Sequence, residues 1–276
     1  MNPQDWLGLA YGLVVGVSLG LTGGGGSIFA VPLLIYGLGV ETRTAIGLSL
    51  AAVGVTAGLG AALRLKAHEI EVLPGVIFAL GGMSCAPLGV WLGRFIPPAV
   101  LLSIFALLMV FVGWRMWCGK AETEGALGPC VSRGGSRLGP GCHARLIGAG
   151  AVAGVLSGLF GIGGGFIIVP ALLYVTGTSI HRAVATSLLA IFLISLAGVA
   201  ANLLHRQAFP MPVSALFGAG GFVGMLLGGG VRTRLSGPAL KKVFAAAMWV
   251  VGAWMLAKNW PAFTASASQW VDALPL

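Results

Sequence analysis

Ten apolar stretches follow one another along the chain, and most charged residues lie in the gaps between them. The stretches run roughly over 6–22, 27–40, 44–63, 72–93, 98–114, 145–160, 165–178, 183–204, 211–231 and 238–257. Only 8% of the residues are charged, against about 25% in an ordinary soluble domain. Several stretches reach the roughly 20 residues that a helix needs to cross a bilayer. The sequence therefore predicts an all-α, polytopic membrane protein.

The chain also repeats itself. Residues 16–50 align without a gap on residues 154–188, at a shift of 138, with 15 identities in 35 positions. After one inserted residue the match resumes, for example at Phe105 and Phe244. This pattern predicts one duplicated unit of five apolar segments. We expect a first repeat over 1–118, a connector over 119–144, a second repeat over 145–260 and a C-terminal tail over 261–276.

Lys and Arg residues indicate how the two repeats are oriented. Suppose that each glycine-containing pair of short segments returns to the side from which it came, with the connector in the cytoplasm. Twelve basic residues then lie inside and four outside, whereas a single broken crossing per pair gives nine and seven. The positive-inside rule favours the hairpin. The repeats are then inverted, with both termini outside the cell. The net charge of +9 is explained by this topology rather than by nucleic-acid binding.

Each repeat contains a glycine run inside an apolar stretch. Each glycine costs about 1 kcal/mol relative to alanine in a helix interior, so Gly23 to Gly26 predict a break in the helix. Within a membrane, open backbone is tolerated only where it faces protein or a watery cavity. Helices that restart near Ser27 and Gly165 would offer free N–H groups, which suit an anion. Inverted repeats with paired breaks are typical of secondary transporters, whose site lies where the breaks meet.

The segment after each break supplies further candidate donors. The predicted substrate-binding residues are Gly23, Gly24, Gly25, Gly26, Ser27, Arg43, Ser49, Gly161, Gly163, Gly164, Gly165, Arg182, Thr186 and Ser187. The structural alternative for the hydroxyls is a bond to a backbone carbonyl, and for Arg43 and Arg182 a solvated position at the interface. Asn202, His68 and His205 are weaker candidates. Close helix packing explains the spaced glycines better: Gly12, Gly16, Gly20, Gly54, Gly58, Gly220 and Gly224.

Other classes of site are poorly supported. A disulfide or metal site using Cys130, Cys142 and His143 is one alternative, but the spacing matches no zinc pattern, and reduced thiols are the ordinary expectation. We expect no metal and no cofactor. The acidic residues all fall in loops or termini, which disfavours proton coupling through a buried carboxylate. An intramembrane enzyme using Ser157 lacks a partnering histidine, so the transport interpretation gives Ser157 only a packing role.

The duplicated motif resembles that of a known family. The stretches "GLTGGGGSIFAVPLL" and "GLFGIGGGFIIVPALL", followed by "AIGLSL" and "AVATSL", are similar to the sulfite exporter TauE/SafE family over nearly the whole chain. The resemblance implies a multi-pass permease of the bacterial inner membrane that moves small anions such as sulfite, sulfoacetate or related organosulfonates. Leu48 stands where the second repeat has Thr186, and Ile162 interrupts the second glycine run. We therefore expect an asymmetric site with more hydroxyls in the second repeat.

Three functions remain open from the sequence. A secondary transporter working by alternating access is the leading hypothesis, a passive anion channel is its nearest rival, and an enzyme is the alternative of a different class. The expected partners are a small anion and the lipid bilayer, with a homo-oligomer as an open alternative and no nucleic acid.

Overall fold

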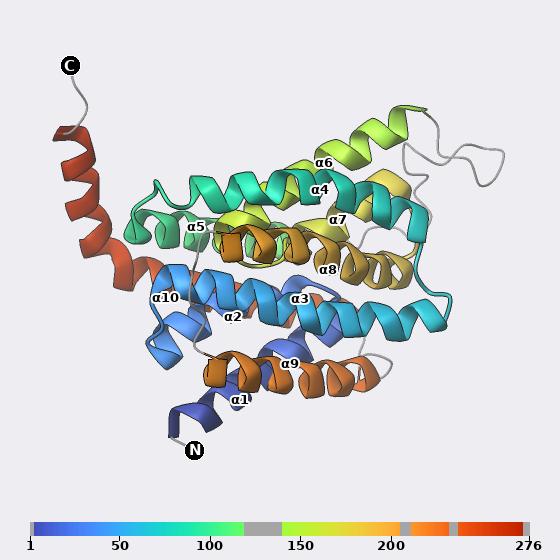
Figure 1. Ribbon diagram of the computed structural model, residues 1–276, viewed down its shortest axis with the longest axis horizontal. Helices are drawn as coiled ribbons and strands as arrows, with labels where there is room; N and C mark the ends of the chain where they lie inside the picture. Colours follow the sequence, from blue (N-terminus) through green and yellow to red (C-terminus); the bar gives the residue numbers. More distant parts are fainter. Residues whose placement is uncertain (1–2, 119–139, 205–210, 232–236, 273–276) are drawn as a thin grey trace. The chain divides into compact units, whose positions relative to one another are not determined.

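The computed structural model describes residues 3–118, 140–204, 211–231 and 237–272, and these residues form helices joined by short turns, with no strand (Figure 1). The helices are α1 (Pro3–Thr22), α2 (Ala30–Pro32), α3 (Thr42–Lys66), α4 (Val72–Leu92), α5 (Pro98–Cys118), α6 (Pro140–Phe160), α7 (Gly165–Thr176), α8 (Ile180–Leu204), α9 (Met211–Val231) and α10 (Gly237–Asp272). A 3₁₀ helix, η1 (Gly25–Phe29), and a π-helical segment, η2 (Leu33–Gly37), flank α2. Each predicted apolar stretch is helical, so the all-α prediction is confirmed.

Five of these helices are long and apolar enough to cross a membrane. Within the described ranges they cover Thr42–Lys66, Val72–Leu92, Pro98–Arg115, Gly141–Phe160 and His181–Leu204. Three of the four helical segments beside the glycine runs are shorter, at Trp6–Thr22, Gly25–Gly37 and Ile167–Thr176, whereas α6, which precedes the second run, is one of the five long helices. Breaking a helix therefore produces the short segments that the sequence predicts beside the glycines.

Helix boundaries repeat along the chain as the sequence does. A shift of 138 residues carries the end of α1 at Thr22 onto the end of α6 at Phe160, and carries the bounds of α3 onto those of α8. A shift of 139 carries the bounds of α4 onto those of α9. These helix boundaries therefore follow the same shift as the sequence repeat.

Two predicted boundaries differ from the structure. Helix α6 begins at Pro140, inside the predicted connector of 119–144, and proline suits a first helical position because its missing N–H needs no partner there. Helix α10 continues through Asp272, so helix covers most of the predicted tail of 261–276. Residues 119–139 of the connector lie outside the described residues.

The helices divide into two compact units that cut across the repeats. One unit holds α1 to α4 and α6 to α9, and the other holds α5 and α10. Each unit thus combines helices of both repeats. The predicted repeats describe the sequence and do not correspond to separate compact bodies.

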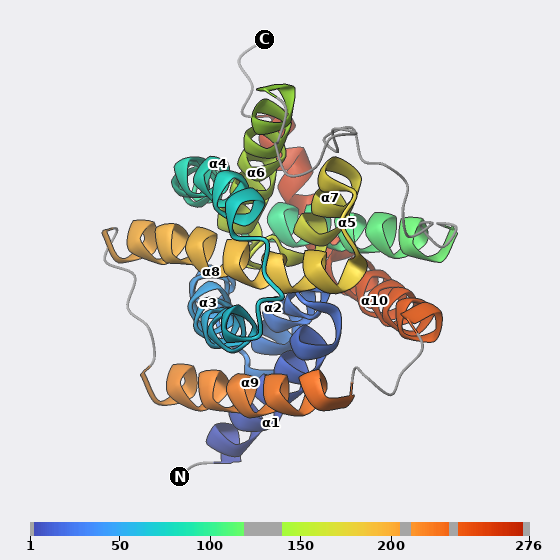
Figure 2. The same cartoon turned by 90° about the vertical axis from the view of Figure 1, so that its right-hand side faces the viewer.

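In the larger unit, glycines bring α1 close to α9 (Figure 2). A Cβ built on Gly12, Gly16 or Gly20 would lie 2.0 to 2.5 Å from the carbonyl oxygens of Phe217, Gly221 and Met225, respectively. Residue numbers rise together along the two helices, so they run parallel. Glycines of α6 contact α4 in the equivalent way: Gly150 meets Phe78, Gly154 meets Gly82 and Gly158 meets Ala86. The first helix of each repeat therefore packs on the fourth helix of the other, and the predicted packing role of Gly12, Gly16 and Gly20 is confirmed.

Helices α3 and α8 are equivalent in the two repeats and pack against each other. A Cβ on Gly54 would contact Ser195, one on Gly58 would contact Phe192, and one on Gly198 would contact Leu50. Residue numbers rise along one helix as they fall along the other. The two equivalent helices are therefore antiparallel.

In the smaller unit, equivalent helices of the two repeats also pack against each other. A Cβ on Gly113 of α5 would meet Trp249 of α10, and one on Gly252 of α10 would meet Val110 of α5. The indole Nε1 of Trp249 donates a hydrogen bond to the carbonyl of Val110 at 3.1 Å. Helices α5 and α10, the fifth of each repeat, are thus also antiparallel.

Candidate substrate site at the two glycine breaks

The first break lies directly after α1. Gly23 and Gly24 have φ values of +72° and +156°, which side-chain-bearing residues rarely adopt, and the 3₁₀ helix η1 follows from Gly25. Thr22 bridges the break, because its Oγ1 donates to the Ser18 carbonyl (2.7 Å) and accepts from the Gly26 N–H (3.1 Å). The predicted break at Gly23 to Gly26 is therefore confirmed.

Beyond the break, the chain runs back along α1. A Cβ on Gly26 would lie 2.3 to 2.4 Å from atoms of Ser18 and Leu19, and one on Gly37 would lie 2.5 Å from the ring of Tyr11. These contacts pair a later residue with an earlier one, so the two segments are antiparallel. Pro32, which has no N–H to donate, is followed by the π-helical turn η2.

The second break has a similar backbone. Gly161, Gly163 and Gly164 have φ values of +70°, +66° and +69°. Helix α7 starts at Gly165 with Gly164 as its N-cap residue, and no side chain caps this end. The first N–H groups of a helix have no partner within it, and the dipole makes this end positive.

The two breaks touch each other. A Cβ on Gly24 would lie 2.7 Å from the Cα of Gly165, and one on Gly165 would lie 2.5 Å from the Cα of Gly24. Each break also packs on the third helix of the other repeat, since Gly23 contacts Val184 of α8 and Gly161 contacts Ile46 of α3. In this conformation no anion fits between Gly24 and Gly165.

Serines of the repeated "SL" motif hold the breaks across the repeats. The hydroxyl of Ser49 donates to the Gly161 carbonyl at 2.8 Å. The hydroxyl of Ser187 lies 2.5 Å from the Gly23 carbonyl and 2.8 Å from that of Val184. Ser27 donates to the Gly24 carbonyl at 2.7 Å. All three serines are fully buried. In this conformation each hydroxyl donates its hydrogen bond to a backbone carbonyl, which is the structural alternative to substrate binding.

Thr186 and Arg182 contact the start of α4 instead of a break. The Oγ1 atom of Thr186 accepts a hydrogen bond from the Glu71 N–H at 3.0 Å, and Arg182 Nη1 lies 3.7 Å from Glu71 Oε1. Burial raises the pKa of the Glu71 carboxyl above its ordinary value, while the Arg182 guanidinium opposes this rise. Glu71 was missed as a site candidate because its sequence position, between two apolar stretches, is that of a solvated loop residue. The side chain is only 24% exposed.

The remaining polar candidates lie elsewhere. Arg43 is exposed near the start of α3. Asn202 is buried, and its Nδ2 donates to the Gly198 carbonyl of the same helix at 3.0 Å. His68 is exposed in the turn after α3, and His205 lies outside the described residues. Arg64 was not predicted, yet its Nη2 lies 3.4 Å from the Gly20 carbonyl, close to the C-terminal end of α1.

Two buried hydroxyls near the second break have no hydrogen-bond partner. They are Ser157 Oγ in α6 and Ser195 Oγ in α8. Ser157 was expected only to pack, and Ser195 was not predicted as a site residue. The available signal was a polar residue in the middle of the apolar run "LLAIFLISLAGV".

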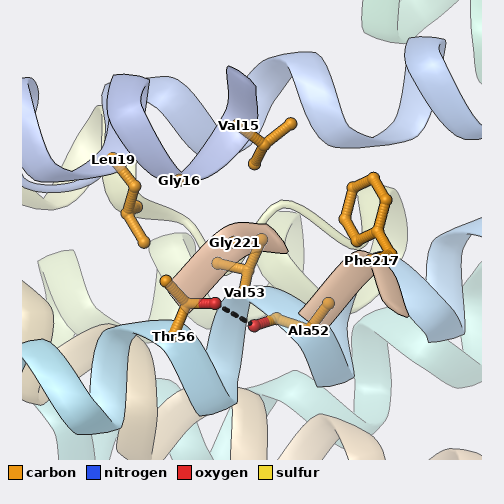
Figure 3. Close-up of a pocket in the computed structure, with 8 residues that line it drawn as sticks. All are labelled: Val15, Gly16, Leu19, Ala52, Val53, Thr56, Phe217 and Gly221. Atoms are coloured by element: carbon orange, nitrogen blue, oxygen red, sulfur yellow. Dashed lines mark hydrogen bonds between the residues drawn. The ribbon is translucent and has the colours of Figure 1, made fainter. Parts of the chain in front are cut away.

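A small cavity lies between α1, α3 and α9 (Figure 3). Its volume is about 10 Å³, enough for a single water molecule. Apolar side chains such as Val15, Leu19 and Phe217 line it, and the Thr56 hydroxyl points to the Ala52 carbonyl of its own helix, 2.8 Å away. A second hollow, of about 290 Å³, lies between α3 and α9 and has apolar walls with Lys66 at its edge. Neither composition suits a small anion.

The cysteines do not build a metal site in the described part of the chain, where no three His, Cys, Asp or Glu residues form a cluster. Cys142, near the start of α6, is disulfide-bonded, while Cys85 and Cys118 are free. The expectation of a reduced thiol is therefore wrong for Cys142. Cys130 lies outside the described residues.

Comparisons with known proteins agree with the repeated motif. The family model described as "Sulfite exporter TauE/SafE" matches residues 8–255. A probable membrane transporter protein of Xylella fastidiosa (strain Temecula1 / ATCC 700964) is 35% identical over 263 residues, covering 92% of this chain and 95% of its own. The probable membrane transporter protein YunE of Bacillus subtilis (strain 168) is 26% identical over 256 residues, covering 87% and 93%. No solved structure shows significant similarity to the chain.

Proposed function

The chain belongs to the sulfite exporter TauE/SafE family, and its relatives are named membrane transporter proteins, so we propose the solute that it carries and the mechanism by which it does so. The solute is a small anion, either a sulfur oxyanion or an organosulfonate such as sulfite or sulfoacetate. The protein is a secondary transporter of the bacterial inner membrane. The direct contact between Gly24 and Gly165 is the single observation that supports this proposal most.

The antiparallel packing of equivalent helices supports an inverted repeat. Helices α3 and α8 are both long enough to span a bilayer. If both cross the membrane, their opposite directions give the two repeats opposite orientations, as in many secondary transporters. Each repeat then contributes a glycine-broken helical hairpin and three further helices.

In the proposed mechanism the anion binds between the two breaks near the midplane. The start of α7 and the first break present backbone N–H groups to it, and the breaks separate to admit it from one side at a time. Because Gly24 and Gly165 are in contact, the conformation described here corresponds to a closed site. Ser49 and Ser187 keep each break attached to the opposite repeat, and Arg43 and Arg182 attract the anion near the entrances.

The cost of removing an anion from water shows that helix ends alone cannot bind it. One helix end contributes about 0.3 to 2 kcal/mol to anion binding, whereas removing an ion from water costs several kcal/mol. The N–H groups therefore need help from further hydrogen-bond donors. The described acidic side chains near these helices, Glu41, Glu69 and Glu71, fall outside the helix interiors, so none repels an anion at the breaks.

Transport in proteoliposomes tests the proposal. We expect accumulation of labelled sulfite or sulfoacetate above equilibrium when an ion gradient is imposed. Uptake that only equalises the concentrations would instead identify a passive anion channel. Absence of uptake for sulfite, sulfate, thiosulfate, sulfoacetate, taurine and chloride, together with no thermal stabilisation by any of them, would contradict anion transport altogether.

A further inference from the structure

Two unpaired hydroxyls flank the second glycine break. Ser157 and Ser195 are 0% and 1% exposed, and their Oγ atoms have no hydrogen-bond partner. Buried polar groups in native proteins are nearly always paired, so an unpaired one calls for a missing partner. In the membrane interior, bulk water is not available to supply it.

The Ser195 hydroxyl lies beside the second break, and Ser157 is in the last turn of α6, where its backbone carbonyl accepts a hydrogen bond from the Gly161 N–H at 2.8 Å. The Oγ of Ser195 is 3.3 Å from the place where a Cβ on Gly163 would stand, so it points at the break from α8. Gly164 packs on α6 at the Ala153 carbonyl, 3.0 Å from its own Cβ position. Ser157 follows Ala153 by four residues and therefore lies on the same face of α6.

The contrast with the other serines is informative. Ser27, Ser49 and Ser187 are equally buried, but each hydroxyl donates a hydrogen bond to a backbone carbonyl. The hydroxyls of Ser157 and Ser195 donate no such bond. Their equivalents in the first repeat, at a shift of 138, are Leu19 and Ala57, which carry no hydroxyl. The two unpaired hydroxyls therefore both belong to the second repeat.

We propose that Ser195 and Ser157 bind the oxygen atoms of the transported anion and, with the first N–H groups of α7, form the selective part of the site. The proposal rests on the proposed transport function and refines it: the ligand is an oxyanion held by the second repeat, while the first repeat closes over it. These two hydroxyls supply the extra donors that helix ends alone do not provide.

Thermal stabilisation of the purified protein tests this assignment. The probe is whichever of sulfite, sulfate, thiosulfate, sulfoacetate, taurine and chloride shifts the wild-type melting temperature most. Ser195→Ala removes no protein hydrogen bond, so the ligand-free melting temperature should stay the same or rise. The apparent affinity of the Ser195→Ala variant for the anion should fall about ten- to hundredfold, which is the effect of losing one hydrogen bond to a charged group. Ser157→Ala should behave similarly.

Ser103→Ala is the matched control. Ser103 is a buried serine of α5 whose hydroxyl already bonds the Ala99 carbonyl at 2.8 Å, so its loss should leave anion affinity unchanged. If Ser195→Ala and Ser157→Ala both keep wild-type affinity, the assignment is wrong although the transport function stands. If the wild type responds to none of the six anions and transports none, the transport function fails, and the assignment fails with it.

Discussion

At the scale of single residues, the serines that join the breaks to the opposite repeat have a measurable role. Ser49→Ala and Ser187→Ala each leave a buried glycine carbonyl unpaired, at Gly161 and Gly23 respectively. Such a loss costs about 1 to 3 kcal/mol. We expect both variants to melt at a lower temperature in detergent than the wild type. Ser84→Ala, which removes an exposed hydroxyl bonded within its own helix, should melt like the wild type.

The glycine at the start of α7 gives a second test at this scale. Gly164 has a φ of +69° and faces the Ala153 carbonyl, so Gly164→Leu is strained and fills the break. We expect this variant to insert into the membrane but to lose both anion-dependent stabilisation and transport. The control is Gly148→Leu, at a position with nothing within 4 Å. Retained binding in Gly164→Leu would move the site away from the second break.

Glu71 should make stability depend on pH. Its pKa is higher in the folded chain than the ordinary 4.5, so the folded state binds the proton more tightly. The resulting stabilisation is complete below about pH 4.5 and is lost as the pH rises through the raised pKa. Relative to Glu71→Gln, the wild type should therefore melt at progressively lower temperature as the pH rises over this window. Arg182→Gln removes the opposing charge and should move the window to higher pH. A constant difference between wild type and Glu71→Gln would contradict this account.

Sequence and structure agree at the residues where local chemistry decides. The glycine runs that start at Gly23 and Gly161 break the helix as the sequence predicts, whereas the glycine run over 228–230 stays helical inside α9. The partners of Ser49 and Ser187 could not be predicted, because they depend on which helix of the other repeat lies alongside. Ser195 and Glu71 were missed for the same reason. A hydroxyl's or a carboxyl's role depends on the neighbours that tertiary packing brings to it.

At the scale of helices, close contact between α1 and α9 depends on glycine. A Cβ on Gly16 would lie 2.0 Å from the Gly221 carbonyl oxygen, so Gly16→Ala forces the two backbones apart. Overpacking of this kind costs about 1 to 3 kcal/mol. Gly148→Ala in α6 adds its methyl to open space and should be neutral or stabilise the helix by up to about 1 kcal/mol. Equal melting temperatures for the two variants would show that the glycine contact is unimportant.

At the scale of the whole molecule, two observations point to opposite membrane topologies. The distribution of Lys and Arg favours a cytoplasmic connector with both termini outside. The disulfide at Cys142 opposes it, because disulfides are rare in the reducing cytoplasm. In a cysteine-free background, we expect Ser132→Cys to react with an impermeant thiol reagent only after permeabilisation. Ser266→Cys should react in intact cells, and the reverse pattern would invert the proposed topology.

The exchange of helices between repeats also affects how the chain is made. Helix α1 ends at Thr22, but its partner α9 begins only at Met211, so roughly 190 residues must be synthesised before the two can meet. At about 5 to 20 residues per second, that interval is on the order of 10 to 40 seconds. Helix α4 has to wait far less time for α6, which begins at Pro140. During biogenesis the glycine face of α1 is therefore exposed to lipid or to an insertion chaperone long before its permanent neighbour emerges from the ribosome.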